Sequence, residues 1–120
     1  MKRVYGLLPW FLIALGAVHC AATWRFYHQL TPAALWFFNG GIVLIFTGVL
    51  NLINHASGAE VKTIRWFCRA ANVVMLGFTV ISGVVGKAGI GSMIALVGIM
   101  GAITVLSFMP IASERAQGRQ

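Results

Sequence analysis

The chain has 120 residues, of which 59% are hydrophobic and only 9% are charged. This composition is too apolar for a water-soluble domain of this length, so a soluble enzyme or carrier is excluded. The formal net charge of +7 comes from nine lysines and arginines against two carboxylates, Glu60 and Glu114. The basic residues form no cluster with interleaved aromatics, so we expect no nucleic-acid partner.

Apolar runs divide the chain at about 5–24, 34–54, 66–86 and 90–112. Each run has roughly the 20 residues that an α-helix needs to cross the hydrocarbon core of a bilayer. We therefore predict an all-α membrane protein whose four transmembrane helices form one domain, residues 1–112, packed as an antiparallel up-down-up-down bundle. The polar residues 113–120 are expected to form a short cytoplasmic tail.

The connections between the runs carry signals for helix starts and ends. Thr31 and Pro32 suit an N-cap followed by the first helical position, where proline's missing N–H does no harm. Gly58 is typical of a helix end. Residues 86–89 form so short a connection that the last two helices must make a tight antiparallel hairpin.

Glycine is dense in the second half of the chain, and small residues let helix backbones approach each other in lipid. Gly98 and Ala102 are four residues apart, so they share one helix face. We expect this pair to pack helices within the chain, and a dimer interface is the alternative.

Basic residues predict the orientation by the positive-inside rule. Arg25 and Lys87 lie in the two connections on one side of the membrane. The others flank the opposite ends of the runs: Lys2, Arg3, Lys62, Arg65, Arg69, Arg115 and Arg119. We therefore predict a multi-pass protein of the bacterial inner (plasma) membrane with both termini in the cytoplasm.

Polar residues inside the runs fall into an outer and an inner group. His19 and Asn39 each lie about five residues from the outer end of a run, roughly 7 Å deep at ~1.5 Å per residue. A hydrogen bond between them would join the first two helices by ~0.6–2 kcal/mol. The same two residues could instead line a small polar vestibule that binds a ligand.

The inner group forms stripes on the second and third runs. Asn51 and Asn72 lie several residues inside the apolar zone, where an unpaired amide costs several kcal/mol. We expect them to pair with each other or with backbone carbonyls, unless they belong to a ligand path. Arg65, Arg69 and His55 are candidates for binding anionic lipid headgroups, with Arg69 reaching toward the cytoplasmic surface.

The histidines and cysteines do not indicate a metal or haem site. His19 and His28 lie on or near one helix, and His55 lies at the other membrane face, so no facing pair can ligate a haem. No histidine or cysteine pair has the spacing of a metal site. Cys20 and Cys68 lie toward opposite faces and are expected to be free thiols. We therefore expect no metal, no cofactor and no catalytic residues.

Because both carboxylates lie outside the runs, the usual groups of proton-coupled transport and carboxylate catalysis are missing. We expect a non-enzymatic accessory, assembly or lipid-interacting scaffold subunit, whose partners are membrane lipids and another membrane protein or further copies of itself. The alternative is a small oligomeric transporter or channel with a polar path through His19, Asn39, Asn51 and Asn72. A third hypothesis is an intramembrane enzyme that acts on a lipid or quinone through His19, His28 or Arg69.

Overall fold

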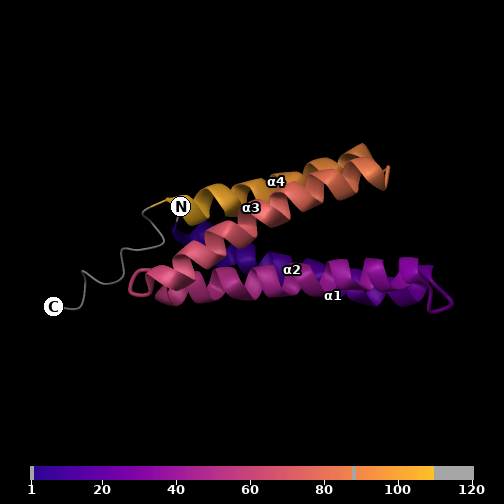
Figure 1. Cartoon of the computed structure of the whole chain (residues 1–120), viewed down its shortest axis with the longest axis horizontal. Helices are drawn as coiled ribbons and strands as arrows, with labels where there is room; N and C mark the ends of the chain where they lie inside the picture. The colour runs from indigo at the N-terminus through magenta and orange to yellow at the C-terminus, as the bar shows by residue number, and fades with distance from the viewer. Residues whose placement is uncertain (1, 88, 110–120) are drawn as a thin grey trace.

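The computed structural model describes residues 2–87 and 89–109, which are helical apart from the turns and Met109 (Figure 1). The helices are α1 (Lys2–Phe26), α2 (Pro32–Ser57), α3 (Lys62–Val85) and α4 (Ile90–Phe108). All four are long and apolar enough to cross a membrane. The predicted all-helical class with four candidate membrane spans is therefore confirmed.

The helix ends follow local chemistry more than the limits of the apolar runs. Thr31 caps α2, because its Oγ1 accepts a hydrogen bond from the Ala34 N–H at 3.2 Å and Pro32 is the first helical residue. The helix α4 ends at Phe108, earlier than predicted, and Met109 is extended with ψ 149°. Pro110 follows, and proline disfavours helical geometry in the residue before it. The rest of the predicted fourth helix and the tail 113–120 lie outside the described residues.

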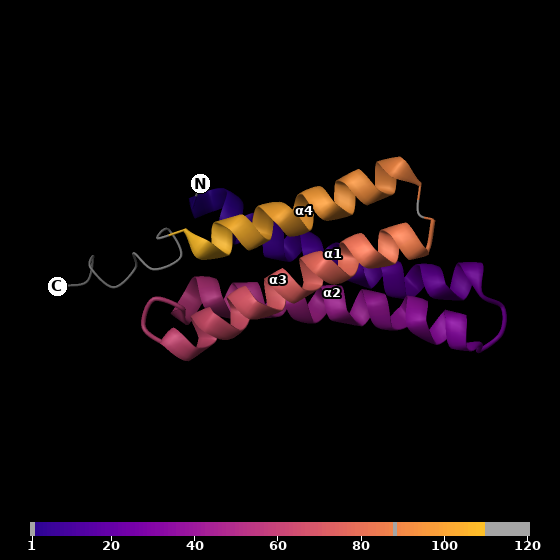
Figure 2. The same cartoon turned by 45° about the horizontal axis from the view of Figure 1, so that its top comes forward.

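The helices are arranged as two hairpins that diverge from one end. The helices α1 and α2 lie side by side along their length, and α3 and α4 form the second hairpin (Figures 1 and 2). The hairpins meet at the end that holds the N-terminus and the α2–α3 turn. They separate toward the other two turns, within overall dimensions of 57 × 23 × 23 Å.

Glycines bring the backbones of α1 and α2 into contact. A Cβ atom on Gly41 would lie only 2.7 Å from the carbonyl oxygen of Gly16 and 2.9 Å from the Cys20 nitrogen. A Cβ atom on Gly48 would lie 2.7 Å from the carbonyl oxygen of Pro9. Close approach of this kind strengthens van der Waals packing, which has to hold helices together where lipid replaces water.

Several glycines of the second half do not pack in this way, although Gly83 of α3 lies against the Met93 side chain of α4. Around Gly77, Gly91, Gly98 and Gly101, nothing lies within 4 Å of an added Cβ atom. The expected internal packing of Gly98 and Ala102 is therefore wrong, and Ala102 is exposed as well. The reason is rotation: the core face of α4 carries Met100, and a residue two positions away points about 200° around the helix.

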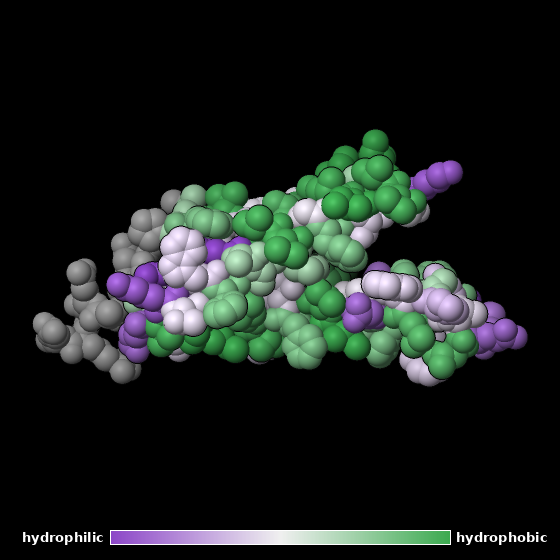
Figure 3. All heavy atoms as spheres, viewed as in Figure 1, coloured by the Kyte–Doolittle hydropathy of each residue, from purple (hydrophilic) through white to green (hydrophobic). Residues whose placement is uncertain are grey.

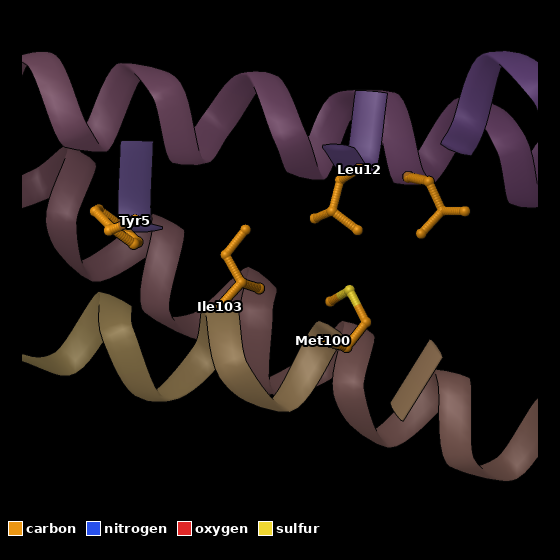
Figure 4. Close-up of a cluster of buried hydrophobic side chains, with 5 residues drawn as sticks. Tyr5, Leu12, Met100 and Ile103 are labelled. Carbon is orange, nitrogen blue, oxygen red and sulfur yellow. The ribbon is translucent and has the colours of Figure 1, made fainter. Parts of the chain in front are cut away.

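The apolar core lies where the two hairpins meet. Tyr5 and Leu12 of α1 point toward Met100 and Ile103 of α4, and each of these side chains is at most 1% exposed (Figure 4). Leu44 of α2 completes this cluster. Contacts between closely packed apolar atoms are individually small but add up over such a cluster.

Beyond this core, each of the four helices exposes large apolar side chains. The buried residues of α3 are Cys68 and Asn72, both in its first half. Figure 3 shows hydrophobic residues along the sides of both hairpins, hydrophilic residues mainly at the two ends, and a notch between the hairpins where they diverge. An exposed apolar surface of this extent suits a lipid environment.

We predict opposite effects of the same substitution at two glycines. Gly41→Ala places a methyl group against the backbone of α1, so the free energy of unfolding should fall by about 1–3 kcal/mol. The methyl group of Gly98→Ala meets open space. This substitution should leave the free energy of unfolding unchanged or raise it by up to ~1 kcal/mol, because alanine has the higher helix propensity. Titration with sodium dodecyl sulfate in mixed micelles, followed by circular dichroism, measures the free energy of unfolding of both variants. An equal loss of this free energy in the two variants would contradict the packing described here.

Candidate functional site

A reciprocal pair of amides joins α2 to α3. Asn51 Nδ2 donates to Asn72 Oδ1 at 2.8 Å, and Asn72 Nδ2 donates to Asn51 Oδ1 at 3.0 Å. Both side chains are 0% exposed. The second N–H of the Asn51 amide is used as well, on the Thr47 carbonyl oxygen at 2.9 Å. The sequence-based expectation that these two asparagines pair with each other is confirmed.

Three further side chains extend this pair. The Tyr5 hydroxyl donates to Asn51 Oδ1 at 3.3 Å and accepts from Asn54 Nδ2 at 2.7 Å. Cys68 Sγ also donates to Asn51 Oδ1, at 3.3 Å. Tyr5, Asn51, Asn54, Cys68 and Asn72 together form what we call the amide hub, which links α1, α2 and α3.

The fourth helix attaches to the amide hub through the backbone. Thr104 Oγ1 lies 2.6 Å from the Met100 carbonyl oxygen and 3.3 Å from that of Asn72, so one hydroxyl bridges α4 and α3. One turn further on, Ser107 Oγ donates to the Thr104 carbonyl oxygen at 2.7 Å. Every helix therefore contributes to one polar network within the apolar core.

The amide hub has one unused acceptor at its α2 end. Asn54 Oδ1 is buried without a hydrogen-bond partner among the described residues. Gly58 lies directly against it, and a Cβ atom at position 58 would collide with this oxygen. Gly58 itself has φ −66°, so glycine is required here by space and not by backbone conformation.

The outer pair predicted from the sequence is not formed. The His19 ring stacks on Phe37, with centroids 3.9 Å apart and an interplanar angle of 21°. Asn39 is exposed, in a shallow hollow lined also by Pro32, Leu35 and Trp36. No hydrogen bond joins His19 to Asn39 within the part of the chain that the structure describes. Asn39 and Phe37 are two residues apart, so they point to nearly opposite sides of α2.

Arg69 binds the end of α4. Its Nε donates to the Ser107 carbonyl oxygen at 3.0 Å, and its Nη2 donates to that of Phe108 at 3.4 Å. The last carbonyls of a helix have no partner within it, so a cation at this position satisfies them and complements the helix dipole. The guanidinium carbon also lies 5.0 Å from the centroid of the Phe108 ring.

The candidate headgroup residues are divided between two places. Arg65 lies one helical turn before Arg69 on α3 and is half-buried. His55 instead packs on α1, with its ring centroid 5.5 Å from that of Tyr5 and its Nε2 over Gly6. The structure therefore brings Arg65 and Arg69 together on one helix face and places His55 against another helix.

Tyr5, Thr104 and Ser107 are members of the polar network that sequence reasoning missed. Their part in it depends on how α1 and α4 rotate against α2 and α3, which no local pattern reveals. Cys68 was treated only as a free thiol, which it is. Its position one turn before Asn72 could have indicated that it shares a face with the inner stripe.

Metal ligands do not gather at this network. In residues 2–87 and 89–109, no three histidine, cysteine or acidic side chains lie close enough to hold a metal ion. Cys20 and Cys68 are free, and Cys20 Sγ instead lies 3.6 Å from the Phe38 carbonyl oxygen. The network therefore consists of carboxamide, hydroxyl and thiol groups.

Comparisons with protein-family models, with curated proteins and with solved structures give no match to this chain.

A double-mutant cycle tests the amide pair. Asn51→Leu and Asn72→Leu each leave a buried amide without its main partner, so each should lower the free energy of unfolding by about 1–3 kcal/mol. The double variant removes both amides and should lose clearly less than the sum of the single losses. Asn39→Leu makes the same change at an exposed site of α2 and should lose almost nothing. Additive losses in the detergent titration would argue against a direct pair.

Proposed function

We propose that this chain is a multi-pass integral membrane protein of the bacterial inner membrane that acts as a non-enzymatic accessory, assembly or lipid-interacting scaffold subunit. The observation that carries the proposal is the amide hub: the most deeply buried polar side chains are bonded to each other and hold the helices together. Groups that are used in this way are not available to bind a substrate. On this proposal, the partners of the protein are membrane lipids and either another membrane protein or further copies of the chain.

The chemistry of the amide hub supports a structural role. Carboxamides neither gain nor lose a proton near neutral pH, so Asn51, Asn54 and Asn72 cannot relay protons or act as a general base. The Cys68 thiol is buried among these amides, and its hydrogen-bond partners in the part of the chain that the structure describes are carboxamides, which cannot activate it as a nucleophile. The contacts of these side chains favour a fixed bundle over a catalytic centre.

For the membrane topology we propose four crossings with both termini in the cytoplasm. Lys62, Arg65 and Arg69 lie at the end of the molecule that holds the N-terminus and the α2–α3 turn. Arg25 and Lys87 lie in or beside the turns at the other end. The larger number of basic residues at the first end supports a cytoplasmic location for it.

Cysteine labelling tests this topology. In a background with Cys20→Ala and Cys68→Ala, single cysteines are introduced as Gln29→Cys, Glu60→Cys and Lys87→Cys. A membrane-impermeant maleimide should label positions 29 and 87 in intact cells and position 60 only after lysis. Labelling of position 60 alone in intact cells would reverse the orientation. Labelling of all three positions in intact cells, of all three only after lysis, or of only one of positions 29 and 87 in intact cells would exclude the four crossings.

The second candidate function is a small oligomeric transporter or channel, and the notch between the hairpins favours it. The notch opens beside apolar residues where the hairpins diverge and narrows toward the end where they meet (Figure 3). The apolar cluster that includes Tyr5 of the amide hub lies where the hairpins meet. On this hypothesis Asn51 and Asn72 would lie at the inner end of a path, with His19 and Asn39 toward its outer end. The hollow beside Asn39 is lined by neither His19 nor Asn51, which speaks for the scaffold.

Flux measurements separate the two candidates. The scaffold proposal predicts that proteoliposomes with the purified protein pass small cations, anions and neutral solutes no faster than protein-free liposomes. A solute flux that Asn51→Leu abolishes, while Gln29→Leu in the exposed α1–α2 turn does not, would instead establish the transporter. Circular dichroism of each variant shows whether a lost flux reflects a lost fold.

A further inference from the structure

The third helix carries a stripe of positive charge at the α2–α3 end. Lys62, Arg65 and Arg69 are three and four residues apart, so they share one face of α3. Both hydrogen bonds of the Arg69 guanidinium go to carbonyl oxygens, which have no formal charge. Glu60 is exposed in the preceding turn. Among the described residues, the contacts of Arg69 therefore hold its side chain in place without neutralising its charge.

The geometry of Arg69 leaves one particular edge of the guanidinium available. Nε and one N–H of Nη2 are directed at consecutive carbonyl oxygens at the end of α4. Nη1 and the other N–H of Nη2 form the opposite edge, whose two parallel donors match two oxygens of a phosphate. The rings of Trp66 and Phe108 flank the guanidinium, with centroids 5.8 Å and 5.0 Å from its carbon.

The surroundings of this edge fit a phospholipid better than a soluble anion. Trp66 is 64% exposed and Phe108 is 49% exposed, although both are large aromatic residues. Aromatic side chains with this exposure are typical of the level of lipid headgroups. Val73, one turn after Arg69 on the same face of α3, is also exposed and apolar, and would lie along acyl chains.

We propose that Arg69 and Arg65 bind the phosphate of an anionic membrane phospholipid, and that this phosphate fixes the end of α4 against α3. The site rests on the proposed membrane role, because the lipid must reach it from the bilayer. Basic residues near a membrane surface attract anionic lipid, and a two-donor hydrogen bond adds to this attraction. His55, which packs on α1, is not part of the site.

Native mass spectrometry of the intact protein tests the proposal. The protein is taken from nanodiscs that contain phosphatidylcholine and phosphatidylglycerol with the same acyl chains. We expect the wild-type chain to retain phosphatidylglycerol in preference. Arg69→Gln should reduce that preference by about tenfold or more, and Lys87→Gln, which removes the same charge at the other end, should not.

Further variants keep the test decisive if Arg69→Gln loosens α4. Arg65→Gln leaves the hydrogen bonds of Arg69 to α4 in place and should reduce the preference without changing the circular dichroism spectrum. Arg69→Lys keeps the charge but loses the two-donor edge, so it should recover only part of the binding. Bound phosphatidylglycerol should also raise the melting temperature of the wild-type chain and not that of Arg69→Gln.

Three results would overturn the site. The first is equal retention of the two lipids by the wild-type chain, and the second is an equal loss of preference in Lys87→Gln and Arg69→Gln. The third is complete displacement of the lipid by inorganic phosphate, which would assign the site to a free anion. If the cysteine labelling still gives four crossings, these results remove the lipid site and leave the membrane role intact. Labelling that excludes the crossings would remove both.

Discussion

A carboxamide inside a bilayer has no water to bond to, and the amide pair of α2 and α3 satisfies this constraint within the protein. Asn51 and Asn72 exchange hydrogen bonds of 2.8 Å and 3.0 Å. The exchange needs both amides at the same depth and facing each other, so it fixes the rotation and the axial position of one helix against the other. Tyr5 and Thr104 then attach α1 and α4 to groups that are already fixed.

The two hairpins are held by different interactions. Between α1 and α2, Gly41 and Gly48 allow the backbones to touch, and this contact extends along the helices. Among the described residues, the second hairpin has no comparable backbone contact with the first and relies on Asn72, Cys68 and the apolar cluster around Met100. The molecule is therefore tightly packed on one side and depends on a few polar contacts on the other.

The sequence predicted the features that depend on depth and on local chemistry. The helices, the Thr31 cap and the Asn51–Asn72 pair all follow from hydropathy and from the cost of an unpaired amide. Features that depend on helix rotation were not predictable. His19 and Asn39 lie at similar depth but on faces that do not meet, and Gly98 faces away from its own core. The apolar run predicts that the last helix extends to residue 112, but α4 ends at Phe108, where Arg69 binds it. Hydropathy alone does not show that Pro110 ends the helix.

The unequal packing of the hairpins has a consequence for biogenesis. The contacts between α1 and α2 are complete without the rest of the chain, so this hairpin can form while the ribosome is still synthesising α3. Until Asn72 enters the membrane, Asn51 keeps the Thr47 carbonyl and Tyr5 as partners but lacks its amide partner. One N–H of the Asn51 amide thus gains its acceptor only when Asn72 arrives, which gives the inserting second hairpin a defined end point.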